Sequence, residues 1–178
     1  SLSVVGDAKL VLGRLLEVIG EGSTAPPGRA QEVAEVRAQG RRNLADRAPE
    51  GVRLMDEIRT AVPGGGIFAN DVCTPAYWGW MLLEVDGPGE YIYPWGFGTL
   101  GAGLPLGMGA KVARPDKAVL AICGDGGFLY TAMELATAVQ FGINIVALVV
   151  NDNRFGILEP QQMDRFGRTT MTELKNPG

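Results

Sequence analysis

A single carboxylate, Asp125, stands among glycines directly after the apolar stretch AVLAIC, in the segment CGDGGF. A second polar cluster, NDN at 151–153, directly follows the apolar stretch NIVALVV. Both apolar stretches have the length and composition of buried β-strands. Ligands of open α/β sheets bind beyond the carboxyl ends of the strands, which is where Asp125, Asp152 and Asp71 would lie.

The glycines of the GDGG segment favour a phosphate-binding turn. They would let the backbone turn sharply and would expose N–H groups at the start of a helix predicted over residues 128–140. A bare carboxylate there would repel a phosphate unless it held a cation, and Mg²⁺ takes one or two protein carboxylates among its oxygen ligands. Either segment alone indicates only a turn, but Asp125 and Asp152 together predict a metal-bridged phosphate site.

The loop GFGTLGAG carries a second glycine pattern. Gly96, Gly98 and Gly101 spell GxGxxG, the dinucleotide-binding fingerprint, with Asp116 following it. A dinucleotide-binding fold needs its acid at the end of the second strand, whereas Asp116 lies in the turn RPDK before a strand begins. A dinucleotide-dependent oxidoreductase is therefore one alternative, and a non-catalytic cofactor-binding or assembly subunit is another.

These residues need a scaffold, and the pattern from residue 52 onward supplies one. Apolar strands alternate with helices, which predicts an α/β fold of three αβα layers around a mostly parallel sheet. We expect helices over VRLMDEIRTAV, over TPAYWGWMLLEV behind a Thr74 cap, over 99–113 and over 128–140. We expect strands over GIFAN, YIY, AVLAIC and NIVALVV.

The N-terminal part differs in texture. Residues 7–19 place apolar side chains on one helical stripe behind Asp7 as a cap, and EGSTAPPG then breaks the pattern. Residues 28–49 are charged and short of large apolar side chains, which favours a solvated helical connector.

Composition limits the function classes. A net charge of −4, with no basic run longer than Arg41-Arg42, disfavours a nucleic acid or an anionic membrane as partner. No apolar run reaches the ~18 residues of a membrane span. Two cysteines, Cys73 and Cys123, are too few for a disulfide framework, so a reducing cytoplasm is expected. Histidine is absent, so that chemistry would depend on carboxylates, backbone groups or a cofactor.

The same residues carry a resemblance. GDG followed after a helix and a strand by ND is similar to the thiamin-diphosphate motif, and YPWGFGTLGAGLPLGMGAKVARPDKAVLAICGDGGF resembles the diphosphate-binding domain of the acetolactate synthase, pyruvate decarboxylase and benzoylformate decarboxylase superfamily. The likeness extends over residues 50–170. It implies the thiamin-diphosphate-binding fold, thiamin diphosphate and Mg²⁺ as cofactors, and decarboxylation or carboligation of a small 2-oxo acid.

By this resemblance, Asp125 and Asp152 would bind the metal together with the backbone carbonyl of Arg154. Gly98 would offer its carbonyl to the aminopyrimidine, and Leu100 would wedge between the two cofactor rings, so that the amino group can take the proton of the thiazolium carbon. The implied cofactor-binding residues are Cys73, Thr74, Gly98, Thr99, Leu100, Gly124, Asp125, Gly126, Gly127, Asp152, Phe155, Gly156 and Ile157.

Three positions bear on the type of family member. Asp152 stands where Asn is commoner. Gln161 stands where acetolactate synthases characteristically carry Trp. Ile157 and Leu158 fall where family members line the substrate pocket, and their apolar character suits a short aliphatic or aromatic 2-oxo acid.

The resemblance also predicts the domain organisation. Residues 1–20 would end a preceding central domain, 21–50 would be a linker, and 51–178 would form a diphosphate- and metal-binding domain truncated at its C-terminus. The family's activating glutamate belongs to an N-terminal domain of a partner subunit, which nothing in this sequence resembles. We therefore expect an inactive fragment of a homodimer or homotetramer whose sites are shared between subunits.

Overall fold

The computed structural model describes residues 3–20 and 28–176 and divides the chain into two compact units, Ser1–Gln39 and Gly40–Gly178. Parts of the predicted preceding domain (1–2), linker (21–27) and cofactor domain (177–178) lie outside the described residues. The predicted domain boundaries stay predictions.

Two helices account for the N-terminal part. Helix α1, Ala8–Ile19, begins behind Asp7, whose carboxylate accepts a hydrogen bond from the Leu10 N–H at 3.1 Å, so the predicted cap is confirmed. Helix α2, Arg29–Ala45, has no buried residue, as expected of a solvated connector.

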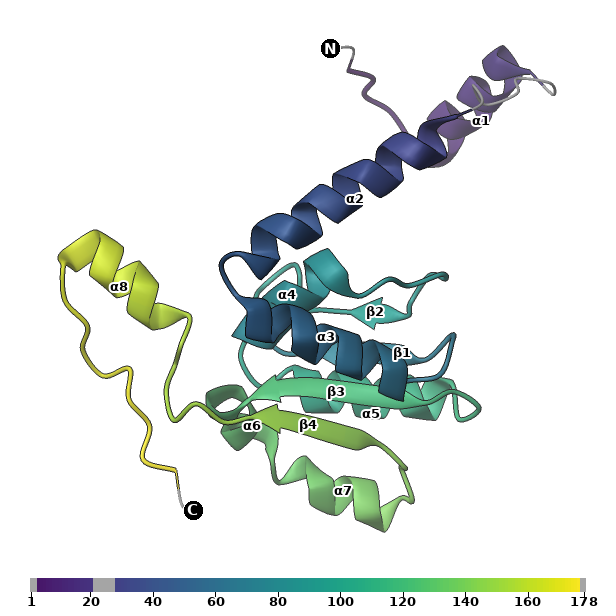
Figure 1. The fold of residues 1–178 in the computed structure, drawn as a ribbon. Helices are drawn as coiled ribbons and strands as arrows, with labels where there is room; N and C mark the ends of the chain where they lie inside the picture. Colours follow the sequence, from purple (N-terminus) through teal and green to yellow (C-terminus); the bar gives the residue numbers. More distant parts are fainter. Residues whose placement is uncertain (1–2, 21–27, 177–178) are drawn as a thin grey trace. The chain divides into compact units, whose positions relative to one another are not determined.

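The second unit is a three-layer α/β fold, as predicted (Figure 1). Its four strands are all parallel and stand in the order β2-β1-β3-β4. The strands are β1 Ile67–Asn70, β2 Tyr91–Ile92, β3 Val119–Gly124 and β4 Val146–Val150. The helices are α3 Pro49–Ala61, α4 Thr74–Leu82, α5 Gly103–Ala113, α6 Asp125–Thr131, α7 Glu134–Gln140 and α8 Leu158–Phe166.

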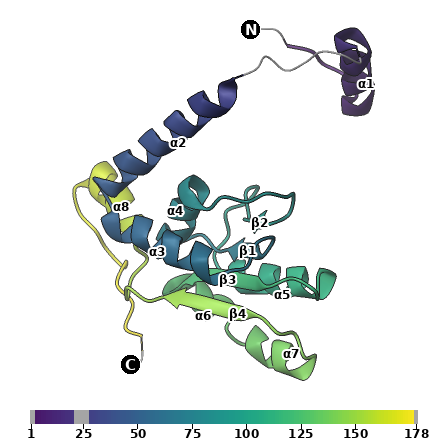
Figure 2. The same cartoon turned by 45° about the vertical axis from the view of Figure 1, so that its right-hand side comes forward.

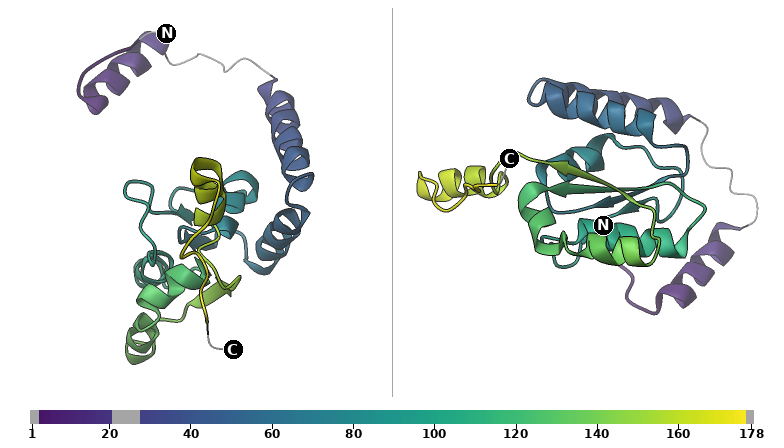
Figure 3. Two further views of the ribbon diagram at one scale, coloured as in Figure 1. Left: turned by 90° about the vertical axis from the view of Figure 1, so that its left-hand side faces the viewer. Right: turned by 90° about the horizontal axis from the view of Figure 1, so that it is seen from below.

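Strand β3 shows why both faces of the sheet are covered. Its successive side chains point to opposite faces. Leu120 and Ile122 join the apolar cluster that contains Met55 of α3, whereas Ala121 and Cys123 join the cluster of α5 and α7. Figure 3 shows α3 on one side of the sheet and α5 with α7 on the other. An apolar run without alternation therefore marks a strand buried on both faces.

Three element boundaries differ from the sequence prediction. Helix α5 begins at Gly103 rather than at residue 99, because Gly98 (φ +65°) and Gly101 (φ +80°) are in left-handed conformations that a helix cannot include. The N-cap of α4 is Cys73, and no side chain caps that end, so Thr74 lies inside the helix.

The third difference concerns the helix predicted over 128–140. The chain turns directly from β3 into α6 at Asp125, because Gly124 is still extended and acts as the N-cap. Helix α6 ends at Thr131, and α7 starts only at Glu134. The GDGG segment is therefore the first turn of a helix rather than a loop before one.

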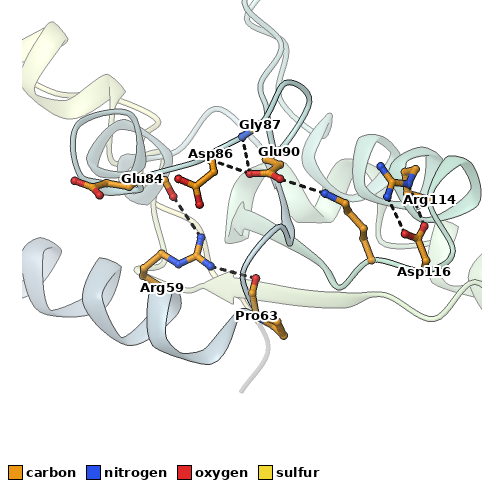
Figure 4. Close-up of polar contacts among 9 residues, drawn as sticks. Arg59, Pro63, Glu84, Asp86, Gly87, Glu90, Arg114 and Asp116 are labelled. Atoms are coloured by element: carbon orange, nitrogen blue, oxygen red, sulfur yellow. Dashed lines mark hydrogen bonds and ion pairs between the residues drawn. The ribbon is translucent and has the colours of Figure 1, made fainter.

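Polar contacts at the amino ends of the strands hold the loops there (Figure 4). The Glu90 carboxylate accepts hydrogen bonds from the N–H groups of Asp86 and Gly87, both at 3.0 Å, and from Lys117 Nζ at 3.2 Å. The Lys117 ammonium lowers the pKa of Glu90. These contacts lie before β2 and β3, so they stabilise the edge of the sheet opposite to the predicted site.

The outer strand β4 has apolar side chains exposed beside it. Helix α7 lies next to β4 (Figures 1 and 2), and Val139 of α7 and Val146 of β4 are 83% and 62% exposed.

Among the described residues, no helix has the length and apolar character that crossing a bilayer requires.

We predict that Gly51→Ala destabilises the protein by up to about 2 kcal/mol. A Cβ at Gly51 would lie 2.5 to 2.9 Å from the Trp78 ring, and overpacking of this kind costs about 1–3 kcal/mol, which the better helix propensity of Ala offsets by only ~1 kcal/mol. Urea unfolding of the two variants measures the difference. Gly109→Ala is the matched control, because nothing lies within 4 Å of its Cβ position, and it should stabilise by ~0.5–1 kcal/mol. Equal effects at both positions would contradict this account of α3 packing on α4.

Candidate functional site

One cavity of about 440 Å³ lies at the carboxyl ends of β1, β3 and β4. Three separate segments line it: the start of α4, the β3–α6 junction and the segment after β4, joined by two residues of the glycine-rich loop. Thr99 is the one predicted site residue that the lining does not include. The others are Cys73, Thr74, Gly98, Leu100, Gly124, Asp125, Gly126, Gly127, Asp152, Arg154, Phe155, Gly156 and Ile157.

Asp125 is a buried residue in the lining of this cavity. It is the first residue of α6 and is only 5% exposed. Its carboxylate accepts a hydrogen bond from Asn176 Nδ2 at 2.6 Å, and the same amide donates to Asn151 Oδ1 at 3.0 Å. Asn176 thus joins the ends of β3 and β4, a contact between distant segments that a sequence pattern does not predict.

The glycines around Asp125 serve a purpose other than the predicted sharp turn. Gly124, Gly126 and Gly127 all lack a positive φ, so a need for left-handed backbone does not explain why these positions are glycine. A Cβ at Gly126 would lie 2.6 Å from the Phe155 ring, and one at Gly127 would lie 2.1 Å from Asp71 Oδ2. Glycine is required there because side chains from two other segments pack directly against the helix backbone.

The segment after β4 turns sharply toward the cavity. Asn153 has φ +57°, a left-handed conformation that Asn tolerates, and its N–H donates to Asn151 Oδ1 at 3.1 Å. Beyond it, Phe155 N–H donates to Thr172 O and Leu174 N–H donates to Asn153 O, both at 2.7 Å. These bonds use the backbone of Asn153 and Phe155 rather than that of Arg154.

Asp152 and Arg154 set the charge at the mouth of the cavity. Burial and the negative charge of Asp125 both raise the pKa of Asp152. The Arg154 guanidinium lies 3.9 Å from the Asp152 carboxylate and donates to Glu159 Oε2 at 3.0 Å. Gly156 leaves room for this arrangement, since a Cβ there would lie 2.7 Å from Asp152 Oδ2.

The glycine-rich loop is held by Asp71, which the sequence placed at this edge of the sheet without a role in the site. Asp71, fully buried at the end of β1, accepts the Gly101 N–H with both carboxylate oxygens, at 3.0 and 3.1 Å. Gly98 and the half-buried Leu100 reach the cavity from this loop. The position of Asp71 after a strand was visible in the sequence, but its partner 30 residues away was not.

The cysteines are unsuited to nucleophilic chemistry. Burial raises the pKa of Cys73 to about 12 and that of Cys123 to about 12, and both thiols are free. A thiol that stays protonated is a poor nucleophile, as expected of a small buried residue. Cys73 and Thr74 do line the cavity, so a role in cofactor binding stays a prediction.

The structure does not support the acidic residue that a dinucleotide site would need, because Asp116 lies away from the glycine-rich loop's cavity. Asp116 pairs with Arg114, accepting hydrogen bonds at 2.7 and 3.0 Å, and this contact lowers the pKa of Asp116 to about 2. The pair precedes β3, at the amino ends of the strands (Figure 4). Asp116 therefore lies at the edge of the sheet opposite to the cavity and cannot contact a ligand bound there.

The donor set fits a metal that keeps water and ligand oxygens. Among the residues described, no three His, Cys, Asp or Glu side chains are placed to hold a metal ion. Two carboxylates, Asp125 and Asp152, face the same cavity, and their mutual repulsion is what a divalent cation would relieve. Mg²⁺ is bound in this way, through one or two carboxylates together with phosphate and water.

Seven residues that line the cavity were not predicted for the cofactor, and three of them have aromatic or amide side chains. Tyr77 and Trp78 of α4 and Gln161 of α8 line the cavity. Trp78 packs against α3 at Gly51 and also lines the cavity. The spacing of aromatic residues along a helix does not distinguish a side chain that packs in the core from one that lines a cavity.

Comparison with known proteins agrees with the site. A family model described as "Thiamine pyrophosphate enzyme, C-terminal TPP binding domain" matches residues 71–177. The chain is 35% identical to the "Probable 2-ketoarginine decarboxylase" of Pseudomonas aeruginosa, over 88% of this chain and 28% of that protein. It is 33% identical to an acetolactate synthase of Bacillus subtilis, over 74% of this chain and 23% of that protein.

A solved structure gives the same result. The thiamine diphosphate-dependent 4-hydroxybenzoylformate decarboxylase of Rhodococcus jostii RHA1 has a similar fold, with a TM-score of 0.66 and 27% sequence identity over 72% of this chain and 24% of that one. The chain thus spans about a quarter of the length of the relatives it matches. The fold, the cavity and these matches together show that the chain belongs to the thiamine pyrophosphate enzymes and contains their C-terminal TPP binding domain.

Proposed function

We propose that this chain supplies the diphosphate- and Mg²⁺-binding half of the active site of a 2-oxo acid decarboxylase or carboligase. The observation that carries the proposal is the single cavity that collects Asp125, Asp152 and the Gly98–Leu100 loop from three separate parts of the chain. Its volume, about 440 Å³, is in the range of cofactor-binding pockets.

The metal-binding side would consist of Asp125, Asp152 and the backbone carbonyl of Arg154. Burial of Asp125 and its hydrogen bond from Asn176 fix one carboxylate before any ligand arrives. The backbone of the first turn of α6 lines the cavity at Gly126 and Gly127, where it would meet a diphosphate oxygen. Such preorganisation lowers the cost of ordering the site on binding.

The pyrimidine side would consist of Gly98 and Leu100. Thiamin diphosphate, when bound, supplies a carbon nucleophile toward the 2-oxo group and stabilises the negative charge left by loss of carbon dioxide. Leu100, half-buried at the cavity, would hold the cofactor in its bent shape, and the Gly98 carbonyl would accept the hydrogen bond of the exocyclic amine. The apolar lining around Ile157 and Leu158 would exclude water from the reacting carbon.

Two of the relatives support a substrate class for this proposal. The names of two of them, a 2-ketoarginine decarboxylase and a 4-hydroxybenzoylformate decarboxylase, both specify a 2-oxo acid. Their side chains differ in charge and shape, so the shared part is the 2-oxo carboxylate. We propose a 2-oxo acid as substrate, with the side-chain pocket formed partly by Ile157, Leu158 and Gln161.

A shared site between subunits is part of the proposal. Among the described residues that line the cavity, Asp125 and Asp152 are the carboxylates, and no glutamate is present to activate the pyrimidine. Trp95 and Phe97, next to Gly98, are 66% and 95% exposed, as expected of side chains that a neighbouring subunit covers. We propose a homodimer or homotetramer, working in the cytoplasm, where free cysteines such as Cys73 and Cys123 persist.

Activity of the full-length protein separates this proposal from a non-catalytic cofactor-binding subunit. Release of carbon dioxide from pyruvate, benzoylformate or 2-ketoarginine, dependent on both thiamin diphosphate and Mg²⁺, would support an enzyme. Cofactor binding without turnover of any 2-oxo acid would favour the assembly role, and stabilisation by NAD instead of thiamin diphosphate would contradict the proposal.

We predict that Asp125→Ala abolishes Mg²⁺-dependent binding of thiamin diphosphate in the full-length protein. Without this carboxylate the diphosphate would meet the negative charge of Asp152 with no bridging cation. Titration calorimetry with and without Mg²⁺ measures the effect. Asp116→Ala is the matched control, because Asp116 lies at the opposite edge of the sheet, and its affinity should equal that of the wild type. Unchanged affinity in Asp125→Ala would remove Asp125 from the metal site.

We predict that Leu100→Ala changes cofactor affinity by less than about tenfold, or ~1.4 kcal/mol, while it lowers kcat by more. Leu100 would hold the reactive shape of the cofactor rather than anchor the diphosphate, so its loss should act mainly on the reaction. Calorimetry and steady-state kinetics on one preparation give the two quantities. Equal losses in affinity and turnover would show that Leu100 only anchors the cofactor.

A further inference from the structure

Asp71 is a fully buried carboxylate that does not line the cavity. It follows β1 and accepts hydrogen bonds from backbone groups of two segments: the Val72 N–H at 2.8 Å and the Gly101 N–H at 3.0 and 3.1 Å. Hydrogen bonds to a charged acceptor are about twice as strong as neutral ones. Asp71 therefore links the end of β1 to the glycine-rich loop.

The glycine-rich loop is held by hydrogen bonds at two glycines, and at the first of them the Gly98 N–H donates to the Pro94 carbonyl at 2.8 Å. Gly98 and Gly101 both have positive φ and belong to no helix or strand. Gly101 is held on both sides, because its N–H donates to Asp71 and its carbonyl accepts the Thr131 hydroxyl at 3.0 Å. Gly98 and Leu100 lie within three residues of Gly101, so a displacement of Gly101 would also displace these two residues.

Asp71 also lies directly against α6. A Cβ at Gly127 would lie 2.1 Å from Asp71 Oδ2, and one at Gly103 would lie 2.9 Å from the Asp71 backbone nitrogen. The carboxylate fits between the loop, α5 and α6 only because two glycines leave it room. One side chain thus contacts both the loop that presents Gly98 and the helix that begins at Asp125.

We infer that Asp71 is a positioning residue that fixes the Gly98–Leu100 loop relative to the first turn of α6, and thereby the pyrimidine-binding side of the site relative to its diphosphate-binding side. The inference rests on the proposed function for the identity of the ligand. Loss of Asp71 should leave the diphosphate anchor in place and displace the groups that hold the other end of the cofactor.

The neighbouring residue shows what a purely structural role looks like. Asn70 is as deeply buried, but its side-chain amide donates to the carbonyls of Phe68 and Ile92 across β1 and β2, each at 3.2 Å. It makes no hydrogen bond to the loop.

Burial raises the pKa of Asp71, and the amides of Val72, Gly101 and Ala102 act against this shift, so the loop's backbone supports a charge that the core alone would disfavour.

The test uses Asp71→Asn in the full-length protein with three measurements. Hydrogen exchange of residues 98–102 without ligand should be about tenfold faster, because the loop loses its charged acceptor. Exchange of the thiazolium C2 proton of bound thiamin diphosphate, followed by NMR, should slow by at least about tenfold, since misplacement by ~1 Å has effects of this size or more. Calorimetric affinity for thiamin diphosphate with Mg²⁺ should change by less than about threefold, because the anchor is untouched.

Thr131→Val provides a milder variant that keeps the shape of the side chain and removes its hydrogen bond to the Gly101 carbonyl. It should change loop exchange and C2-proton exchange in the same direction as Asp71→Asn, by a smaller factor. Thr60→Val is the matched control, because the Thr60 hydroxyl bonds to Asp56 O within α3 at 2.8 Å. It should leave both quantities unchanged. If Asp71→Asn does not fold, the comparison of the two Thr variants decides.

Asn70→Ala controls for general loss of stability. It should lower the melting temperature without altering loop exchange or C2-proton exchange. The inference is overturned if Asp71→Asn or Thr131→Val leaves both exchange rates within twofold of the wild type (~0.4 kcal/mol), or if Asn70→Ala changes them equally. Failure of the wild type to bind thiamin diphosphate would instead refute the proposed function, and loop exchange in the ligand-free protein would still show whether Asp71 fixes the loop.

Discussion

Parallel pairing of β1, β3 and β4 is the constraint on which the rest of the site depends. The register sets Asn70 opposite Ile122 and Gly124 opposite Val150, so the residues that follow each strand emerge at one edge of the sheet. No strand contributes a complete binding site, and each contributes only the first residues after its end. The opposite edge has its own polar contacts, such as Glu90 with Lys117, which hold loops together.

Close packing carries this constraint from the sheet to the loops. Phe155 lies against the backbone at Gly126, and the Asp71 carboxylate lies against the backbone at Gly127. Each contact joins α6 to a different neighbouring segment, and each requires the absence of a Cβ. The glycines therefore serve two purposes at once: they leave the first turn of α6 accessible from the cavity, and they let the segments that frame the cavity approach it closely.

The sequence predicted those parts of the fold that depend on local pattern. Runs such as AVLAIC and NIVALVV indicated buried strands, and their alternation with helices put Asp125 and Asp152 at the same edge, where the structure has them. The start of α6, the role of the glycines and the contacts of Asp71 and Asn176 were not predictable in this way. Each of them depends on a side chain from a distant segment, and composition or periodicity does not record which segments meet. The assigned chemical roles stay predictions, because no ligand contact tests them.

Charge at the cavity mouth links the fold to the proposed chemistry. Asp152 adds a second negative charge beside Asp125, and burial together with this repulsion raises its pKa. Arg154 compensates only in part, since its guanidinium lies 3.9 Å from Asp152 and makes a shorter contact of 3.0 Å with Glu159. A site with two facing carboxylates and one shared counter-ion favours a divalent cation more than a site with one carboxylate and an amide. The same excess charge opposes a diphosphate that arrives without a metal. Under the proposed function, cation and cofactor should therefore bind this chain with strong mutual dependence, the cation supplying the positive charge that Arg154 does not.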